Sequence, residues 1–246
     1  MTRRLVLLTL LIMLLASACG RRNQANPVTV VLFDLTASTA AGSIRGQYLR
    51  DFGKILEGLT AGGTLAVDII DDNPLAHSSF PIMASFSRYD PLTENRLGYD
   101  RRIKAQREAV ARQAQMIVTA RPSRRQGTSV MDALQLAERA FASYEGSPRV
   151  LVLFSDMIEQ SGRYDFAREA LTPARINQIV ERERAAKHVP DLRDVEVCVV
   201  GAGAARSGGI SPDRFLAIQA FWIEYFKAAG AHLPKERYGS ALLKCP

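Results

Sequence analysis

The sequence predicts an α/β protein of three layers, in which a doubly wound, mostly parallel sheet with one antiparallel edge strand lies between helices. Two patterns predict this class. Short apolar runs rich in β-branched and aromatic residues, which are typical of strands buried on both faces, alternate with longer amphipathic segments. One pair of runs, at residues 64–70 and 79–87, follows without a helix between, and this predicts an antiparallel pair at one edge.

The predicted elements follow one another in a regular order. Strands are expected at residues 28–33, 64–70, 79–87, 149–154 and 195–200, and helices at 44–59, 94–120, 130–144, from 173 onward and from 212 to the glycine at 230. Thr172 and Ser211 each precede a proline, as expected of an N-cap before the first helical residue. Ser129 and Asp132 are typical of a capping box at the helix that begins at residue 130.

The first 18 residues predict a secretory signal peptide. Two arginines precede an apolar stretch from Leu5 to Leu15, which is about half the roughly 20 residues that a membrane-spanning helix needs. The small residues that end in Cys19 resemble the bacterial lipobox, and this resemblance implies a lipidated Cys19; cleavage by an ordinary signal peptidase, with Cys19 as a plain thiol, is the alternative. Residues 19–26 would then be the lipidated cysteine and a polar tether, and residues 27–246 one domain.

This reading predicts an exported protein that is lipid-anchored to a bacterial membrane and faces the periplasm or the surface. Gly20, rather than Asp, after the cysteine resembles outer-membrane sorting, so the outer membrane is favoured. Two cysteines remain, Cys198 and Cys245, and in an oxidising compartment they form either a disulfide across adjacent strands or two buried free thiols.

The charge of the chain does not indicate a nucleic-acid partner. The formal charge of +7 falls to +5 once the two arginines of the signal peptide are removed. Most of the surplus lies between Arg88 and Arg125. A solvated helix face is the simpler interpretation of this segment, and contact with anionic lipid is the alternative for a tethered protein.

Two aspartates stand at the ends of predicted neighbouring strands. Asp34 follows the first strand and opens the loop Asp34-x-Thr36-x-Ser38, while Asp156 follows the strand at residues 149–154. Ligands of open α/β sheets bind beyond the carboxyl ends of the strands, so these side chains are expected to face one crevice. Carboxylate and hydroxyl oxygens are hard ligands that suit Mg2+, Mn2+ or Ca2+.

The order of these residues resembles the von Willebrand factor A (VWA) domain, which has a Rossmann-like fold and a metal-ion-dependent adhesion site. Asp34, Thr36 and Ser38 match its first loop, although Thr36 replaces the usual Ser. Thr128 matches its later threonine, and Asp156 its final aspartate, although Met157 replaces the Gly that usually follows. The resemblance covers residues 27–244.

The resemblance implies a metal site that binds a protein partner rather than an enzyme. Thr36 and Ser38 would bind the cation directly, Asp34 and Asp156 directly or through water, and Thr128 when the partner binds. The partner would supply an acidic residue to the open coordination position, and Mg2+ is the expected ion, with Mn2+ or Ca2+ as alternatives.

Three other functions stay open at this point. Gly201-Ala-Gly203 after a strand resembles a dinucleotide-binding fingerprint, but Arg206 stands at the third glycine position. A metal-assisted phosphatase using Asp34 and Asp156 is a second alternative. The third is a structural envelope lipoprotein that has the same fold and binds no metal.

Overall fold

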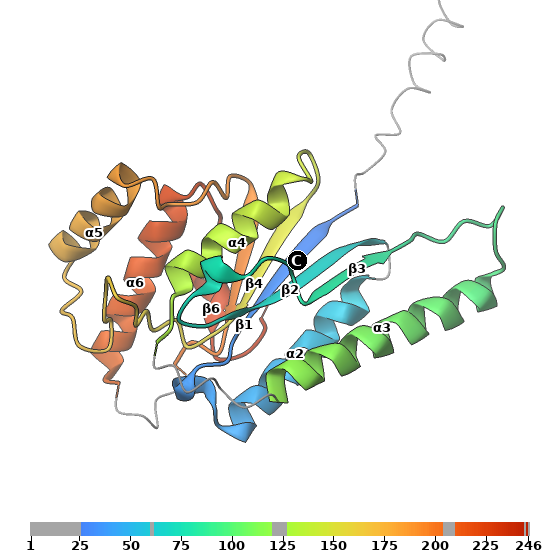
Figure 1. Ribbon diagram of the computed structural model, residues 1–246, viewed down its shortest axis with the longest axis horizontal. Helices are drawn as coiled ribbons and strands as arrows, with labels where there is room; N and C mark the ends of the chain where they lie inside the picture. The colour runs from blue at the N-terminus through green and yellow to red at the C-terminus, as the bar shows by residue number, and fades with distance from the viewer. Residues whose placement is uncertain (1–25, 60–61, 120–126, 204–209, 244, 246) are drawn as a thin grey trace, which may run out of the picture.

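The computed structural model describes residues 26–59, 62–119, 127–203, 210–243 and 245 (Figure 1). Six strands form one sheet in the order β3-β2-β1-β4-β5-β6. Their bounds are β1 Val28–Asp34, β2 Gly63–Ile70, β3 Ile82–Phe86, β4 Arg149–Phe154, β5 Val195–Val200 and β6 Tyr238–Gly239. β3 pairs with β2 antiparallel and every other pair is parallel, so the predicted fold class is confirmed.

Helices cover both faces of this sheet (Figure 1). The α-helices are α2 Gly42–Gly58, α3 Arg96–Thr119, α4 Val130–Ala142, α5 Pro173–Ala185 and α6 Pro212–Ala228, with short 3-10 turns η1 Ala37–Thr39, η3 Pro74–Ala76 and η5 Lys235–Arg237. Alternate side chains of a strand point to opposite faces. Accordingly, Val31 and Phe33 of β1 pack with α2 and α3, whereas Val30 and Leu32 pack with α4, α5 and α6.

Four aromatic side chains of α6 form the centre of the core on the side of the sheet that α4, α5 and α6 cover. Phe221, Trp222, Tyr225 and Phe226 are fully buried. The indole Nε1 of Trp222 donates to the carbonyl oxygen of Met157 at 2.7 Å. The core of this face therefore also holds the loop that follows β4, where Asp156 lies.

The predicted helix caps are confirmed at two helices and wrong at a third. Thr172 and Ser211 accept the amides three residues later, at 3.2 and 3.3 Å. At α4, the Ser129 side chain caps nothing, and the Asp132 carboxylate instead pairs with Arg163. A carboxylate distant in sequence caps the helix instead, since Glu159 Oε2 accepts from the Met131 amide at 3.1 Å. The local pattern is overridden because a buried acceptor reaches one of the amides that the Ser129 side chain would cap.

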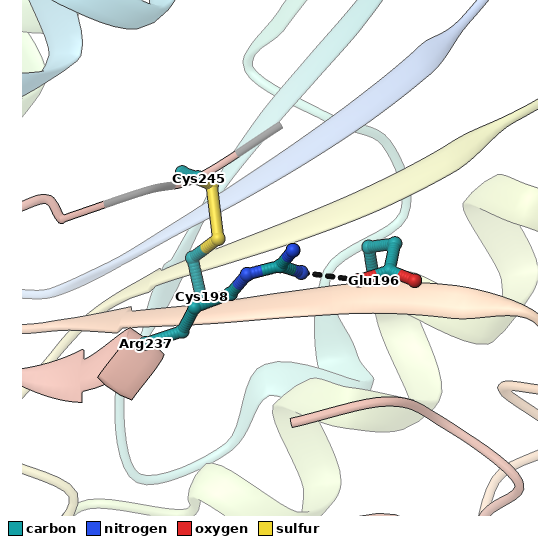
Figure 2. The surroundings of a disulfide bond; sticks show 4 residues. All are labelled: Glu196, Cys198, Arg237 and Cys245. Carbon is teal, nitrogen blue, oxygen red and sulfur yellow. Dashed lines mark hydrogen bonds and ion pairs between the residues drawn. A yellow bond between two sulfur atoms is a disulfide. The ribbon is translucent and has the colours of Figure 1, made fainter. Parts of the chain in front are cut away.

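A disulfide joins Cys198 of β5 to Cys245, with 5.9 Å between their Cα atoms (Figure 2). The sequence left open a disulfide or two free thiols, and the structure has the disulfide. Cys245 was expected on a strand adjacent to β5, but it lies outside the described strands. The sixth strand is instead the short Tyr238–Gly239 pair beside β5. Beyond it, the Leu242 amide donates to Asp51 of α2, so the C-terminal segment crosses to the α2 face.

The two ends of the central strand β1 have different neighbours. Asn26 and Pro27 precede its amino end, and Asp34 is the residue at its carboxyl end. The predicted signal peptide, Cys19 and the tether as far as residue 25 lie outside the described residues. Within the described ranges, no helix has the length and apolar character needed to cross a bilayer.

Candidate metal centre

Asp34 is the last residue of β1 and is completely buried at the carboxyl edge of the sheet. Its Oδ1 accepts from the amide of Thr36 at 3.1 Å and from the Thr36 hydroxyl at 2.6 Å. Its Oδ2 accepts from the Ser155 hydroxyl at 2.7 Å, which ties β1 to the end of β4. The Thr39 hydroxyl donates to the Asp34 carbonyl at 2.6 Å and closes the loop. The Asp34 carboxylate is therefore rigidly oriented before any ligand arrives.

Thr36 and Ser38 bring two hydroxyl oxygens together in the same loop. Their Oγ atoms lie 3.3 Å apart, with Thr36 buried and Ser38 exposed. Because the Thr36 hydroxyl donates its proton to Asp34, it can only accept from Ser38, and its remaining lone pair can face an electrophile. The loop therefore has the oxygen acceptors that the sequence predicted, open to solvent at Ser38.

Asp156 lies two residues beyond the end of β4 and is also buried. Its Oδ1 accepts from the Ile158 amide at 3.1 Å. Its Oδ2 is buried, and no described residue donates to it. Buried polar atoms are nearly always paired in native proteins, so an unpaired carboxylate oxygen calls for an ion or a water molecule.

Met157 occupies the position where glycine is usual in VWA domains. Its backbone has φ 64°, in the left-handed region that glycine adopts without steric cost. For a residue with a side chain this conformation costs about 1–2 kcal/mol. The fully buried Met157 side chain and the bond from Trp222 to its carbonyl offset that cost. The departure from the motif thus preserves the backbone shape of the loop.

The two carboxylates destabilise each other's charge. Burial raises the pKa of Asp156 to about 7, and the nearby charge of Asp34 adds to this, while the Ser38 hydroxyl opposes it. Burial also raises the pKa of Asp34, against the hydrogen bonds from Thr36 and Ser155. Two buried carboxylates that repel each other are stabilised by a cation between or beside them.

Two buried tyrosines are affected by the charge of Asp156. The hydroxyl oxygens of Tyr48 and Tyr238 are buried without a partner among the described residues. Burial raises the pKa of both phenols, and the charge of Asp156 adds to the shift in each. Asp156 Oδ2 and the hydroxyl oxygens of the two tyrosines that feel its charge are thus three buried polar atoms without partners among the described residues.

Arg45 is the permanent positive charge of this region. Its guanidinium donates to the carbonyl oxygens of Leu35 and Val118, both at 3.1 Å, and fastens the Asp34 loop to the end of α3. Its charge lowers the pKa of Asp34, although less than burial raises it. One buried cation therefore offsets part of the charge of Asp34.

Thr128 lies at the same edge of the sheet but has no hydrogen bond to the other four predicted ligands in the described structure. Its backbone pairs with Gln160, which follows β4, at 2.8 and 2.9 Å. The next amide, that of Ser129, donates to the carbonyl of Asp71, which follows β2. Since β2 and β4 flank β1, this segment passes between the loops on either side of Asp34.

The donor set fits a hard divalent cation better than a transition metal. The described residues contain no group of three or more His, Cys, Asp or Glu side chains that could hold a metal. The oxygens available are two carboxylates and the Thr36 and Ser38 hydroxyls, which suit Mg2+, Mn2+ or Ca2+. The unpaired Asp156 Oδ2 and the mutual repulsion with Asp34 are the observations that a cation would account for.

Sequence reasoning missed the residues that support this centre. Ser155 directly precedes Asp156, and its position beside a candidate ligand was the available signal. Tyr48 lies on the predicted apolar face of the helix after the Asp34 loop, a pattern that indicates burial but not a place at the site. No local pattern distinguishes Arg45, on the same helix, from a solvent-facing residue. Tyr238 carries no signal, because its strand is only two residues long.

Gly201 has a packing role at this site. Its backbone has φ 101°, and a Cβ there would lie 2.5 Å from the Tyr48 hydroxyl oxygen. The amides of Gly201 and Ala202 both donate to the carbonyl of Gly239, at 2.9 and 3.0 Å. Amides engaged in this way do not face a phosphate, so the geometry does not favour the dinucleotide interpretation. Arg206, at the third glycine position, lies outside the described residues.

Comparisons with known proteins find alignments among solved structures only. No protein-family model matches the chain, and no curated protein matches it. Among solved structures, a von Willebrand factor type A protein from Catenulispora acidiphila aligns at 13% identity and TM-score 0.39, over 84% of this chain and 43% of its own. Manganese-loaded Plasmodium vivax TRAP protein aligns at 13% identity and TM-score 0.45, over 89% of this chain and 69% of its own.

An aerotolerance-related membrane protein from Bacteroides fragilis aligns at 17% identity and TM-score 0.37, over 72% of this chain and 67% of its own. The chain thus spans less than half the length of the Catenulispora protein. The antiparallel edge strand and the candidate loop at the carboxyl end of the central strand β1 are features that the sequence resemblance to VWA domains predicted.

Proposed function

We propose that this protein is an exported, membrane-anchored VWA-type protein that binds a partner protein through a divalent cation. Asp34, Thr36, Ser38 and Asp156 would hold the cation, and Thr128 would join them when the partner binds. The cation, Mg2+ in the first instance, would supply an open coordination position for an acidic residue of the partner. Binding, and not turnover, is the activity proposed.

The observation that carries this proposal is the unpaired Oδ2 of Asp156 beside a second buried carboxylate. An unpaired buried polar atom costs about 1–3 kcal/mol, and more when charged. A cation in contact with Asp156 and Asp34 would reverse the sign of their interaction. The pre-formed hydrogen bonds of Asp34 support the same interpretation, because they orient the loop hydroxyls at no further entropic cost.

The experiment is thermal unfolding in chelator and in Mg2+, Mn2+ or Ca2+, since a ligand that binds only the native state stabilises it. At a concentration of about 100 times Kd, the gain is about 2.7 kcal/mol, or a rise of roughly 5–10 °C for a domain of this size. Ser38→Ala is the cleanest variant, because Ser38 is exposed and its loss leaves the Asp34 hydrogen bonds in place. We expect the metal-induced rise to shrink strongly in Ser38→Ala and to disappear in Asp34→Ala.

A matched control is Asp68→Ala. Asp68 is a buried aspartate of the same sheet, paired with His77 at 3.0 Å and remote from the candidate ligands in sequence. This variant should lower stability and keep the full metal-induced rise. If no ion stabilises the parent chain at millimolar concentration, the proposal fails, and a structural envelope protein with a metal-free VWA fold becomes the favoured function.

A further inference from the structure

We propose that the segment joining β3 to α3, together with the first turns of α3, lies on the surface of an anionic lipid bilayer. We call residues 87–104 the arm. It projects beyond the sheet at the end of the molecule opposite α5 and α6 (Figure 1). This inference is independent of the cation site, and it rests in part on the lipid anchor of the proposed function.

The arm begins where the described N-terminal segment begins. The register pairs Gly63 with Phe86 and Val28 with Thr64, so the end of β3 and the start of β1 share one edge of the sheet. Beside Gly62, the position of a Cβ would lie 2.8 Å from Arg88 Cγ and 3.3 Å from Asn26 Oδ1. The first residues of the arm therefore lie next to the residue at which the tether would end.

The length of the tether limits how far this edge can be from the membrane. Asn26 is seven positions after Cys19 (26 − 19 = 7). At 3.3–3.6 Å per extended residue, this segment spans at most about 25 Å. A bilayer that holds a lipid on Cys19 must then lie within that distance of the arm.

The arm presents apolar side chains to solvent. Leu92, in the turn before α3, is 94% exposed, and Leu97, in the first turn of α3, is 61% exposed. The half-buried Tyr89 packs under the Arg96 guanidinium, which lies 5.2 Å from its ring centre. Apolar tips flanked by aromatic and basic residues are typical of proteins that bind at the membrane interface.

The charges of the arm favour an anionic surface. The Asp90 carboxylate accepts from the Leu92 amide at 2.9 Å, Glu94 pairs with Arg102, and Asp100 pairs with Arg96. Arg101 and Lys104 have no ion pair with any described residue and are exposed. They share a helix face with Leu97, at spacings of four and three residues, while Tyr99 and Ile103 face the core. One face of α3 thus combines an apolar residue with two unpaired positive charges.

The orientation that results separates the two functional edges. β1 rises about 20 Å from Val28 to Asp34, at about 3.3 Å per residue. With the arm on the bilayer, the candidate cation site lies at the far edge of the sheet. A partner protein would then reach Asp34 from the solvent side without contacting lipid.

The test is binding of the chain from Gly20 onward, which contains every described residue, to phosphatidylcholine vesicles with or without phosphatidylglycerol. Chelator is present throughout, so the result does not depend on the cation site. Each basic residue near an anionic surface strengthens binding about fivefold, so the double variant Arg101→Gln and Lys104→Gln should bind about 25-fold more weakly. The matched control, Arg182→Gln with Lys187→Gln, changes the same charge at the exposed end of α5 and should retain binding.

A second readout reports contact at single positions. An environment-sensitive fluorophore on Leu92→Cys should be quenched by brominated lipid, whereas one on Leu216→Cys, at a leucine of α6 that is 58% exposed, should not. Equal vesicle binding with and without phosphatidylglycerol, or equal loss in the α5 control, would overturn the proposal. An unquenched label at Leu92 would also overturn it, and would make the arm a surface for protein instead.

Discussion

Asp156 and Glu159 are two buried carboxylates in the same loop, but the groups around them differ. Burial raises the pKa of both to about 7, and each has one oxygen without a donor among the described residues. The other oxygen of Glu159 accepts from the Met131 amide in the first turn of α4. The charge of Asp132 raises the pKa of Glu159 further, and the charge of Arg163 opposes that rise. Asp156 instead lies beside Asp34, a second carboxylate.

The difference indicates which of the two is explained by the fold alone. A carboxylate at a helix N-terminus is stabilised by unpaired amides and by the helix dipole, so Glu159 has a structural role. Asp156 has a single amide donor and a like charge nearby, an arrangement that raises the free energy of the folded protein. The same pKa therefore reports a cap in one case and, we infer, a ligand site in the other.

The largest expected effect that separates them is the pH dependence of stability. Both groups have a folded pKa above the ordinary values of 3.8 and 4.5, so the folded state binds more protons than the unfolded state. The contribution of these two groups to the free energy of unfolding is then fully present below about pH 4. It is lost as pH rises through about 7, by on the order of 3 kcal/mol per group. Urea unfolding between these limits, in chelator, should show this fall.

Saturating Mg2+ should remove the contribution of Asp156 and leave that of Glu159, because a bound cation favours the ionised form of its ligands. The fall in stability with pH should therefore become about half as steep. Identical slopes in chelator and in Mg2+ would mean that Asp156 does not contact the ion. In Glu159→Gln, the slope that persists in Mg2+ should disappear.

The next effect in size is the cost of removing each side chain. Glu159→Ala leaves the Met131 amide without its acceptor and opens a cavity, and should cost about 3 kcal/mol. Glu159→Gln keeps the volume and an acceptor, and should be neutral within about 1 kcal/mol. Asp156→Asn in chelator at pH 8 should stabilise the protein, because it removes a buried like charge. A destabilised Asp156→Asn would show that Asp156 supports the fold as Glu159 does.

The smallest effect sharpens the role of Glu159 as the cap of α4. Ser129 caps nothing, and its hydroxyl donates to the Asp72 carbonyl over a long 3.4 Å. Ser129→Ala should therefore change the free energy of unfolding by less than about 0.5 kcal/mol. Thr172→Ala, which removes a working N-cap of α5, should cost about 1 kcal/mol in the same denaturant titration. Equal losses of unfolding free energy in the two variants would show that Ser129 caps α4, as the local pattern predicted.

Much of the fold could be predicted because it follows from local pattern. The runs at β1 and β4 are apolar on both faces, which only a buried parallel strand requires, and their carboxyl ends place Asp34 and Asp156 at one edge. Thr172-Pro173 and Ser211-Pro212 mark helix starts through backbone chemistry of adjacent residues. The details that failed were those in which distant groups compete with local ones, such as the cap of α4 and the place of Cys245.

The sequence by itself determined which segments form strands and that the two aspartates and the hydroxyl loop follow strand ends. It could do so because periodicity and strand ends are properties of neighbouring residues. Only the tertiary structure decided how those oxygens are paired. Ser155 bonds to Asp34 across 121 positions, and Tyr48 and Tyr238 come to the same carboxylate from α2 and β6. Burial and electrostatic repulsion depend on every group within a few ångströms, and chain folding, not sequence proximity, selects those groups.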